Sequence, residues 1–540
     1  MSYGRVEASF DAAVRPGLAR TATNNDGVKL FTGVIAYAYD VHAGAFRKHR
    51  SVLVDGLRIV AFDEDPAGTS VERVACEGAT LLPAFADCHV HLTDTGLFLD
   101  ERNLNRTRSY QEFAAQVTRV AREWGVVFAG QYDESAWKDG RVADAAPLER
   151  AHPDARAMLV RVDGHSCIVN RATFIWLNLP DGIEGIERDA DGRPTGKLFL
   201  DANWRAQSAF MEAMPLEAKR AAEQRAAELA RSNGIVHVHA QLVGFRREQY
   251  AEEIDALRAL PGKWYPKICT PDPHLAAELG LRYVGGDVFV DGSIGSRTAA
   301  VSEPFCGTHE HGKLRYSDDE LLDYFAAAQG AGIAAGVHAI GDRAIEQCVR
   351  TWERVLGERP AGVRHFIEHF EIATEEQIEA CARMGVYLSM QPQFDALWGG
   401  EGAMYDERLG TRRMHSMNAL GRAQRAGAVL CGGSDSPVCE LSALHGMQAA
   451  IAHHEPRERL TSEEALLMYT FNAAKLGYVE RQTGVLAPGY AADFVLLDRD
   501  PLAGGRFDDC TVLQTWSDGE CIFSRQTPPC QSGGNDERYR

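Results

Sequence analysis

Short apolar runs alternate with amphipathic stretches through the middle of the chain. Residues 216–230, for example, carry apolar side chains at helical spacing and precede Gly234, a residue type common after helix ends. Apolar runs of four to eight residues bounded by turn residues are typical of buried strands. The alternation therefore predicts a parallel α/β architecture. We expect its eight strands at residues 81–90, 234–240, 264–270, 286–291, 334–339, 363–369, 385–391 and 428–434.

The pattern changes towards both ends of the chain. Residues 28–78 and 483–525 contain short β-rich runs separated by turn-forming residues, such as Asp55 followed by Gly56. Residues 1–27 have no clear period, which predicts a flexible arm. Residues 526–540 are rich in proline, glycine, serine and charged side chains, a composition typical of a disordered tail.

A long insertion, at about residues 95–230, separates the first two expected strands. Long insertions in barrel enzymes usually form lids or pocket walls on the catalytic face. Residues 130–137 and 162–165 of this insertion include Trp137 and His165, which are candidates for contact with a substrate. The alternative is that both are structural residues of the insertion.

Composition narrows the class of protein. The chain has 540 residues, of which 45% are hydrophobic and 25% charged, as in ordinary globular proteins. Its net charge of −19 argues against nucleic acid or an anionic membrane as a partner. We find neither a secretory signal nor an apolar run of about 18 residues that could span a membrane. The twelve cysteines include no Cys-x-x-Cys pair. A reduced, cytoplasmic protein is expected.

Candidate chemistry begins at the end of the first expected strand. His89 and His91 form a His-x-His pair, and alternate residues of a strand point to the same face. Both imidazoles could therefore bind one cation. The alternative for an isolated pair is two polar residues on a half-buried strand.

Four motifs, in order, strengthen the metal-site interpretation. They are PAFADCHVHL from residue 83, VHAIGDRAI from 337, RHFIEHFEI from 364 and GGSDSPV from 432. Together they resemble the metal-dependent amidohydrolase superfamily, and more closely the amidohydrolase-3 branch, which contains proteins like N-substituted formamide deformylase. The resemblance covers about residues 28–525. It implies a (β/α)8 TIM-like barrel at residues 79–482 and a small β-sandwich domain built from residues 28–78 and 483–525.

The resemblance also implies a set of site residues. The metal ligands would be His89 and His91 on the first strand, His338 on the fifth, His369 on the sixth and Asp435 on the eighth, all at the carboxyl ends of the strands. A nitrogen-rich set suits Zn2+, with Mn, Fe or Co as alternatives. Asp435 would be the general base, and His369, where it is not a ligand, would polarise the scissile carbonyl.

The chain departs from the superfamily at the fourth strand. Many members carry there a carboxylated lysine that bridges two metal ions, whereas this chain has Asp287, whose side chain is several atoms shorter. Its role as a ligand is doubtful at this point. We therefore expect one tightly held ion, bound by His89, His91, His338 and Asp435, with two ions as the alternative. His237 and His239 on the second strand are expected to be structural or to line the pocket.

The functional hypothesis is hydrolysis of a non-peptide C–N bond in an amide, formamide or cyclic amide. Arg297, which follows the fourth strand, joins Trp137 and His165 as a candidate substrate-binding residue. A decarboxylase, isomerase or C–O hydrolase on the same scaffold is an alternative, as is a non-catalytic binding homologue. The expected partner is a small-molecule substrate, and a homodimer is one assembly compatible with the sequence.

Overall fold

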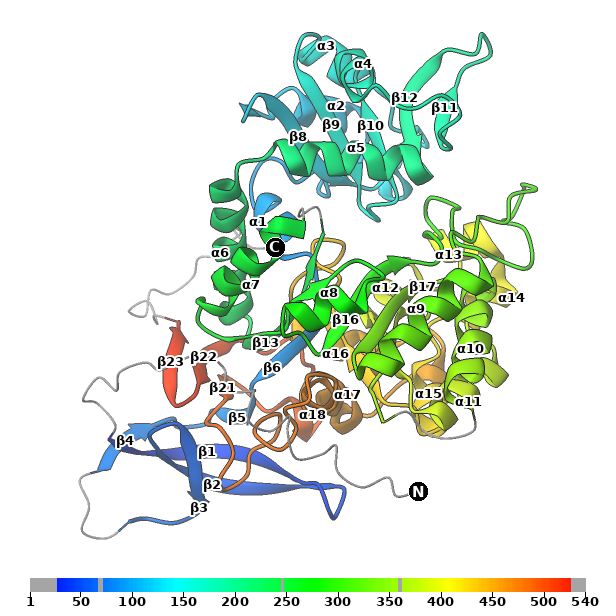
Figure 1. The fold of residues 1–540 in the computed structure, drawn as a ribbon. Coiled ribbons are helices and arrows are strands. Elements are labelled where there is room, and N and C mark those ends of the chain that lie inside the picture. Colours follow the sequence, from blue (N-terminus) through cyan, green and yellow to red (C-terminus); the bar gives the residue numbers. More distant parts are fainter. Residues whose placement is uncertain (1–26, 67–70, 244–246, 358–361, 526–540) are drawn as a thin grey trace.

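The fold is described from a computed structural model, which covers residues 27–66, 71–243, 247–357 and 362–525. The expected disordered tail and all but the last residue of the expected flexible arm lie outside the described residues. Figure 1 shows three parts: a sheet built from both ends of the chain, central parallel strands surrounded by helices, and the insertion at the top of the view.

The parallel strands form two hydrogen-bonded sheets. The first sheet contains β6, β13, β14 and β15, and the second runs in chain order from β16 to β20. The strands are β6 (Phe85–Val90), β13 (Ile235–Leu242), β14 (Lys263–Trp264), β15 (Lys267–Ile268), β16 (Tyr283–Phe289), β17 (Ala334–Ala339), β18 (Phe366–His369), β19 (Tyr387–Met390) and β20 (Leu430–Gly432). A parallel bridge between Val90 and Ser436 connects the segment after β20 to β6.

Burial explains why these strands read as continuous apolar runs. Every residue of β6, β13, β17 and β18 is buried, as expected for parallel strands covered on both faces. The first expected strand is divided at Pro83, which has no backbone N–H to donate to a ladder. The residues before Ala84 pair antiparallel with a strand from the other end of the chain instead. The third expected strand is likewise present as two short pieces, β14 and β15.

Helices follow the parallel strands and cover their outer side. They are α6 (Leu216–Ser232), α7 (Tyr250–Arg258), α8 (Pro273–Glu278), α9 (Asp318–Ala331), α10 (Asp342–Leu356), α11 (Glu375–Met384), α15 (Leu420–Arg425), α16 (Ala443–Ala452), α17 (Ser462–Met468) and α18 (Phe471–Leu476). Local sequence fixes several ends: α9 begins with a capping box of Ser317 and Glu320 and ends at Gly332, whose φ is 68°. Within the described ranges, no helix combines the length and the apolar character that a membrane crossing requires.

Shorter helices lie in the loops. They are η2 (Arg247–Gln249), α12 (Pro392–Trp398), α13 (Met404–Leu409), α14 (Thr411–Met414), η3 (Pro456–Glu458) and η4 (Pro501–Ala503). Of these, α12 and α13 contribute side chains to the wall of the candidate site described below.

Strands from both ends of the chain meet in one sheet of eight strands. They are β1 (Val28–Asp40), β2 (Ala45–Asp55), β3 (Arg58–Phe62), β4 (Val71–Ala75), β5 (Thr80–Pro83), β21 (Phe494–Leu497), β22 (Val512–Ser517) and β23 (Glu520–Ser524). The two ends join where β5 pairs with β21. Phe31 packs edge-on against Phe494 and Trp516 in the core of this sheet. The division into a two-sheet sandwich stays a prediction.

The insertion has a sheet and a core of its own. Its strands, in the spatial order β11-β12-β10-β9-β8-β7, form a six-stranded sheet above the parallel strands (Figure 1). The elements are α1 (Leu92–Leu97), α2 (Tyr110–Val117), β7 (Arg122–Glu123), β8 (Val126–Tyr132), η1 (Glu134–Ala136), α3 (Ala146–Ala151), β9 (Arg156–Arg161), β10 (Ser166–Val169), α4 (Arg171–Leu177), β11 (Ile186–Arg188), β12 (Pro194–Phe199) and α5 (Leu200–Ala213).

A buried carboxyl pair lies where α1 meets α6 and α7. Glu223 accepts a hydrogen bond from Thr93 at 2.7 Å, and both Glu223 and Glu253 are at most 2% exposed. Burial, together with the neighbouring Glu253, raises the pKa of Glu223 well above its ordinary value of 4.5. At pH values above about 4.5, Glu223 therefore keeps its proton in the folded protein and loses it in the unfolded chain. Stability must fall as the pH rises from about 4.5 towards the raised pKa.

We expect Glu223→Gln to flatten this pH dependence. The amide cannot ionise, so its contribution to the free energy of unfolding does not change as the pH rises. Thermal unfolding of both proteins between pH 6 and 9 measures the difference, and wild type should lose more stability over this range. Glu228→Gln, an exposed change on the same helix, is the control. Parallel pH profiles for wild type and Glu223→Gln would contradict the expectation.

Candidate metal centre and active site

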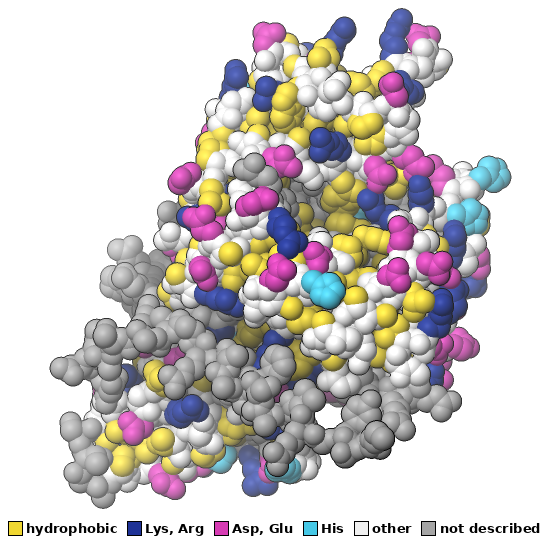
Figure 2. Space-filling view, viewed as in Figure 1, with side chains coloured by type: hydrophobic (Ala, Val, Ile, Leu, Met, Phe, Trp, Pro, Cys, Tyr) yellow, Lys and Arg dark blue, Asp and Glu magenta, His cyan; other side chains and the backbone are white. Residues whose placement is uncertain are grey.

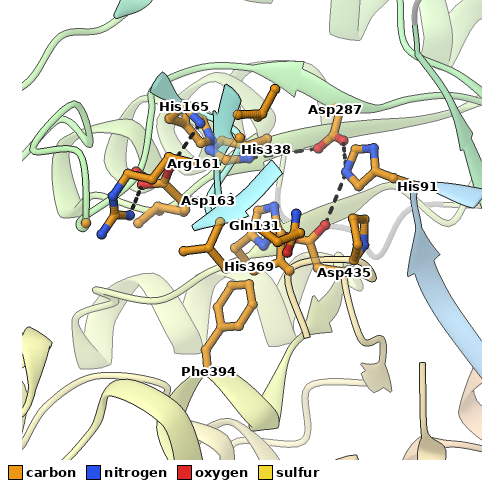
Figure 3. Close-up of a pocket in the computed structure, with 18 of the residues that line it drawn as sticks. His91, Gln131, Arg161, Asp163, His165, Asp287, His338, His369, Phe394 and Asp435 are labelled. Atoms are coloured by element: carbon orange, nitrogen blue, oxygen red, sulfur yellow. Dashed lines mark hydrogen bonds and ion pairs between the residues drawn. The ribbon is translucent and has the colours of Figure 1, made fainter. Parts of the chain in front are cut away.

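Six side chains converge at the carboxyl ends of the parallel strands. They are His89 and His91 at the end of β6, Asp287 in β16, His338 in β17, His369 at the end of β18 and Asp435 after β20. Figure 3 shows Asp287 and Asp435 on either side of the His91 ring. The five residues implied by the resemblance are thus brought together, and Asp287 lies among them.

Two imidazoles and two carboxylates form the tightest group. His91 Nε2 lies 3.0 Å from Asp287 Oδ2 and 3.1 Å from Asp435 Oδ1. His89 Nε2 lies 3.2 Å from the same Asp435 oxygen and 3.5 Å from the same Asp287 oxygen. Ligands of a tetrahedral ion with bonds of about 2.0–2.2 Å are about 3.3–3.6 Å apart. Three of the four nitrogen–oxygen separations are shorter than this range by about 0.1–0.3 Å, and the fourth lies within it.

Buried polar atoms without hydrogen-bond partners also indicate a cation site between these side chains. His89 Nε2, Asp287 Oδ2 and Asp435 Oδ1 are buried and have no hydrogen-bond partner among the described residues. Buried polar atoms normally have partners, because leaving one unpaired costs about 1–3 kcal/mol. These atoms point at one another across a common space, so the donor set fits a divalent cation.

His338 lies on the other side of Asp287, and His369 lies between His338 and His89. His338 Nδ1 is 3.9 Å from Asp287 Oδ1, the oxygen that faces away from His91. The rings of His338 and His369 are 4.5 Å apart, and that of His369 is 5.0 Å from His89. Asp287, doubtful as a ligand from the sequence, therefore has one oxygen near His91 and the other towards His338.

The backbone is strained at two of these residues. His369 has a φ of 72° and Asp435 a φ of 55°, in the left-handed region that non-glycine residues rarely adopt. Asp435 is held there by strand β6, because its N–H donates to the carbonyl of His89 at 2.8 Å. The buried carboxylate of Asp87 accepts from the N–H groups of Ser434 and His89 and ties the same two segments together.

The histidines and carboxylates of this group shift one another's pKa values. Burial would lower the pKa of His91, but Asp287 and Asp435 together raise it to about 10. Burial would raise the pKa of Asp287, and His89 and His91 hold it well below its ordinary range. Without a cation, protons on the imidazoles thus compensate the two carboxylates. A cation at the same place would replace these protons, as metal binding usually does.

A cavity opens directly above the metal group, the name used below for His89, His91, Asp287, His338, His369 and Asp435. Aromatic and aliphatic side chains from the insertion and from the strand-to-helix loops form much of its wall, and Figure 2 shows hydrophobic side chains between the insertion and the body below it. Aromatic wall residues are Phe98, Phe128, Trp204, Phe289, Phe394, Trp398 and Tyr405. Trp204 stacks on Phe289 with ring centroids 4.3 Å apart.

The three residues suggested for substrate binding have different positions. His165 lines the cavity, and its ring lies 5.1 Å from that of His338. Trp137 is in the core of the insertion, where it packs against Phe113, and does not line the cavity. Arg297 is in the turn after β16, with a φ of 56°, and is also absent from the lining.

One cation lies in the cavity wall, and its charge is already compensated. Arg161 contacts Glu134 at 3.0 Å, Asp163 at 2.8 Å and Asp133 at 3.2 Å. Among the described residues that line the cavity, no other lysine or arginine occurs. Asp163 also accepts hydrogen bonds from Ser293 and Ser296 at 2.7 Å, which connects the insertion to the loop after β16.

Sequence reasoning missed several residues around the site. Lys267 and Glu368 form a buried ion pair below His89, and Gln241 contacts both Glu368 and His89. Glu368 precedes His369 in a recognised motif, and Lys267 and Gln241 lie within apolar runs. Charged or amide side chains within apolar runs are a general signal for such buried pairs, since burial requires a partner.

A buried group of nitrogen and oxygen donors at the carboxyl ends of parallel strands, below a cavity, defines a metal-dependent enzyme of the α/β class. Residues 72–523 match the profile of the amidohydrolase family. The chain belongs to this family.

Relatives that are named as hydrolases agree with this class. The chain is 28% identical over 466 residues to a putative amidohydrolase, YtcJ, of Bacillus subtilis, covering 80% of this chain and 86% of the relative. It is 25% identical over 530 residues to an N-substituted formamide deformylase of Arthrobacter pascens, covering 88% and 95%. The structure of an uncharacterised metal-dependent hydrolase from Pyrococcus horikoshii superimposes with a TM-score of 0.69 at 22% identity, covering 89% of this chain and 99% of that one.

Proposed function

We propose that this chain hydrolyses a non-peptide C–N bond in an amide, formamide or cyclic amide, on a closed (β/α)8 barrel. The observation that carries the proposal is the position of Asp435, whose Oδ1 is shared by His89 and His91 at the floor of the cavity. Family membership and the similarity to a formamide deformylase support the reaction class. Cytoplasmic location and a homodimer stay predictions from the sequence.

The proposed cofactor is one Zn2+ ion. His89 Nε2, His91 Nε2, Asp287 Oδ2 and Asp435 Oδ1 would hold it, since each of the two imidazole nitrogens lies 3.0–3.5 Å from both carboxylate oxygens. The sequence-based ligand set had His338 in the place of Asp287. We now assign His338 to the far side of Asp287 and His369 to the space between His338 and His89.

The protein groups have separate tasks in this reaction. A bound divalent cation would lower the pKa of a water molecule and polarise the scissile carbonyl. Asp435 would accept the proton of the attacking water and pass it to the leaving nitrogen. The cavity wall would hold the substrate with its carbonyl above Asp435.

His369 is poorly suited to donate a hydrogen bond to an oxyanion. Its Nδ1 lies 2.9 Å from Gln391 Oε1, an acceptor, so Nδ1 carries the proton and Nε2 presents a lone pair. The alternative role, polarisation of the carbonyl, needs a second proton at Nε2. Burial lowers the pKa of His369, which disfavours that second proton.

The charges of the cavity favour a substrate without a carboxylate. Arg161 is paired with three carboxylates, and no second cation lines the described cavity to receive an anion. Burying an unpaired charge costs several kcal/mol. The aromatic wall instead suits an uncharged aromatic or branched aliphatic substituent.

A matched substrate pair tests both the reaction and this preference. N-formylphenethylamine and N-formylphenylalanine differ only by one carboxylate, and we expect kcat/KM to be at least about 100-fold higher for the neutral compound. Glu134→Gln removes one partner of Arg161 and should narrow this ratio, whereas Glu149→Gln on the surface of the insertion should not. Equal rates for both compounds would contradict the charge argument.

A wider panel tests the reaction class. With Zn2+-loaded protein and not with chelator-treated protein, formamides and N-acyl amines should release an amine, and cyclic amides should open to an amino acid. Carbon dioxide release from carboxylic acids, or ester hydrolysis without amide hydrolysis, would favour the decarboxylase or C–O hydrolase alternative. Turnover of none of these compounds by metal-loaded protein would contradict the proposed function.

A further inference from the structure

A buried lysine–carboxylate pair lies on the side of the His89 ring that is opposite the proposed ion. Lys267, in β15, donates to Glu368 Oε1 at 2.7 Å and to the carbonyl of Cys88 at 2.9 Å. Both side chains have no exposed surface. The second carboxylate oxygen, Glu368 Oε2, lies 3.0 Å from His89 Nδ1. Strands β6, β15 and β18 thus contribute to one connected group.

The tautomer of His89 decides whether it can bind a metal ion. Nε2 presents a lone pair only when the proton of the neutral ring is on Nδ1, and that proton needs an acceptor. Two groups are near Nδ1: Glu368 Oε2 and Gln241 Nε2, at 3.1 Å. The Gln241 amide nitrogen also donates to Glu368 Oε1 at 3.3 Å, and its oxygen faces Cys269. Gln241 therefore presents a donor, and Glu368 is the acceptor.

Two unpaired atoms have one common explanation. Glu368 Oε2 and His89 Nε2 are both buried without a hydrogen-bond partner among the described residues. A proton on Nδ1 directed at Oε2, with a cation at Nε2, would satisfy both atoms. The cost of burying the Glu368 carboxylate is offset by Lys267, because a buried charge requires a partner.

We propose that Glu368 is a positioning residue that holds His89 in the form protonated at Nδ1, and that Lys267 holds Glu368 in place for this task. The inference rests on the proposed metal site. Carboxylate partners of metal-binding histidines typically change metal affinity by about 10–100-fold when they are removed. Glu368 and Lys267 would therefore set the affinity of the site for the ion through His89, without contacting the ion themselves.

The test measures the dissociation constant of Zn2+ with a competing chelator, independently of turnover. Glu368→Gln should weaken Zn2+ binding by about 10–100-fold, because the amide cannot accept from Nδ1 and from Lys267 with equal strength. Lys267→Met alone would leave a buried carboxylate unpaired, so the double variant Lys267→Met/Glu368→Met is the second protein. It contains neither an unpaired charge nor an acceptor for Nδ1, and it should show the same loss of affinity.

A similar triplet elsewhere in the chain provides a matched control. Asp493 lies 2.8 Å from Lys263 Nζ and 3.5 Å from His237 Nε2, but His237 is not in the metal group. Asp493→Asn should lower the unfolding temperature of the metal-free protein and leave Zn2+ affinity unchanged.

The outcomes are distinct. Wild-type Zn2+ affinity in Glu368→Gln and in the double variant, with only a lower unfolding temperature, would show that the pair merely joins strands and would overturn the inference. A wild-type protein that binds no Zn2+ would overturn the metal site and the inference together. Weaker Zn2+ binding in Asp493→Asn as well would show a general effect of lost stability, and would also overturn it.

Discussion

Asp435→Asn is expected to lower kcat by about 10²–10⁴-fold, the usual contribution of a general base. The asparagine side chain has nearly the same shape, so strand β6 can still hold the segment through the hydrogen bond to His89. It cannot accept the proton of the attacking water. Substrate binding, measured as the dissociation constant of an unreactive analogue, should change much less than kcat.

The control for this experiment is Asp342→Asn. Asp342 follows the strand that carries His338, but its carboxylate accepts from Ser302 rather than facing the metal group. Its replacement should leave kcat close to the wild-type value. An Asp435→Asn enzyme within about tenfold of wild type, below the range expected for a general base, would show that the base is another residue.

His89→Ala or His91→Ala is expected to remove the metal ion and the activity together. Each change deletes one of two nitrogen donors in the group of four, and the one imidazole that remains compensates the two carboxylates only in part. Elemental analysis of the purified proteins and their far-ultraviolet circular dichroism separate loss of metal from loss of fold. The fold should persist, because the rest of the core does not depend on two residues at the ends of strands.

His239→Ala is the matched control for this pair. His239 belongs to a second His-x-His sequence, on β13, and is fully buried against Tyr265, with neither ring nitrogen in a described hydrogen bond. This variant should lose stability but keep its metal. Full metal retention in both His89→Ala and His91→Ala would end the site assignment.

The same analysis decides the number of ions. One ion per wild-type chain is expected, because the imidazole nitrogens of His89 and His91 face the same two carboxylate oxygens. Asp287 has its second oxygen towards His338, however, so it has the orientation that a bridging carboxylate would need. Two equivalents of metal, with activity dependent on the second, would show that this short side chain bridges two ions.

The insertion shows which features local sequence patterns could not predict. Its position over the site followed from its place after the first strand, but its six-stranded sheet contains short strands without strong periodicity. Trp137 consequently resembled a residue of the pocket, although it packs into the core of this sheet. Exposure of an aromatic residue to a cavity depends on which elements pack against it, and sequence spacing contains no such information.

The sequence by itself determined the α/β alternation and five of the converging site residues. In parallel α/β architectures the functional side chains follow the strands, so His89, His91, His338, His369 and Asp435 could be placed at one end from local patterns and from the resemblance. Only the tertiary structure decided the place of Asp287 and the group of Glu368, Lys267 and Gln241. Their roles depend on distances of a few ångströms between side chains on different strands, and the period of a strand does not specify those distances.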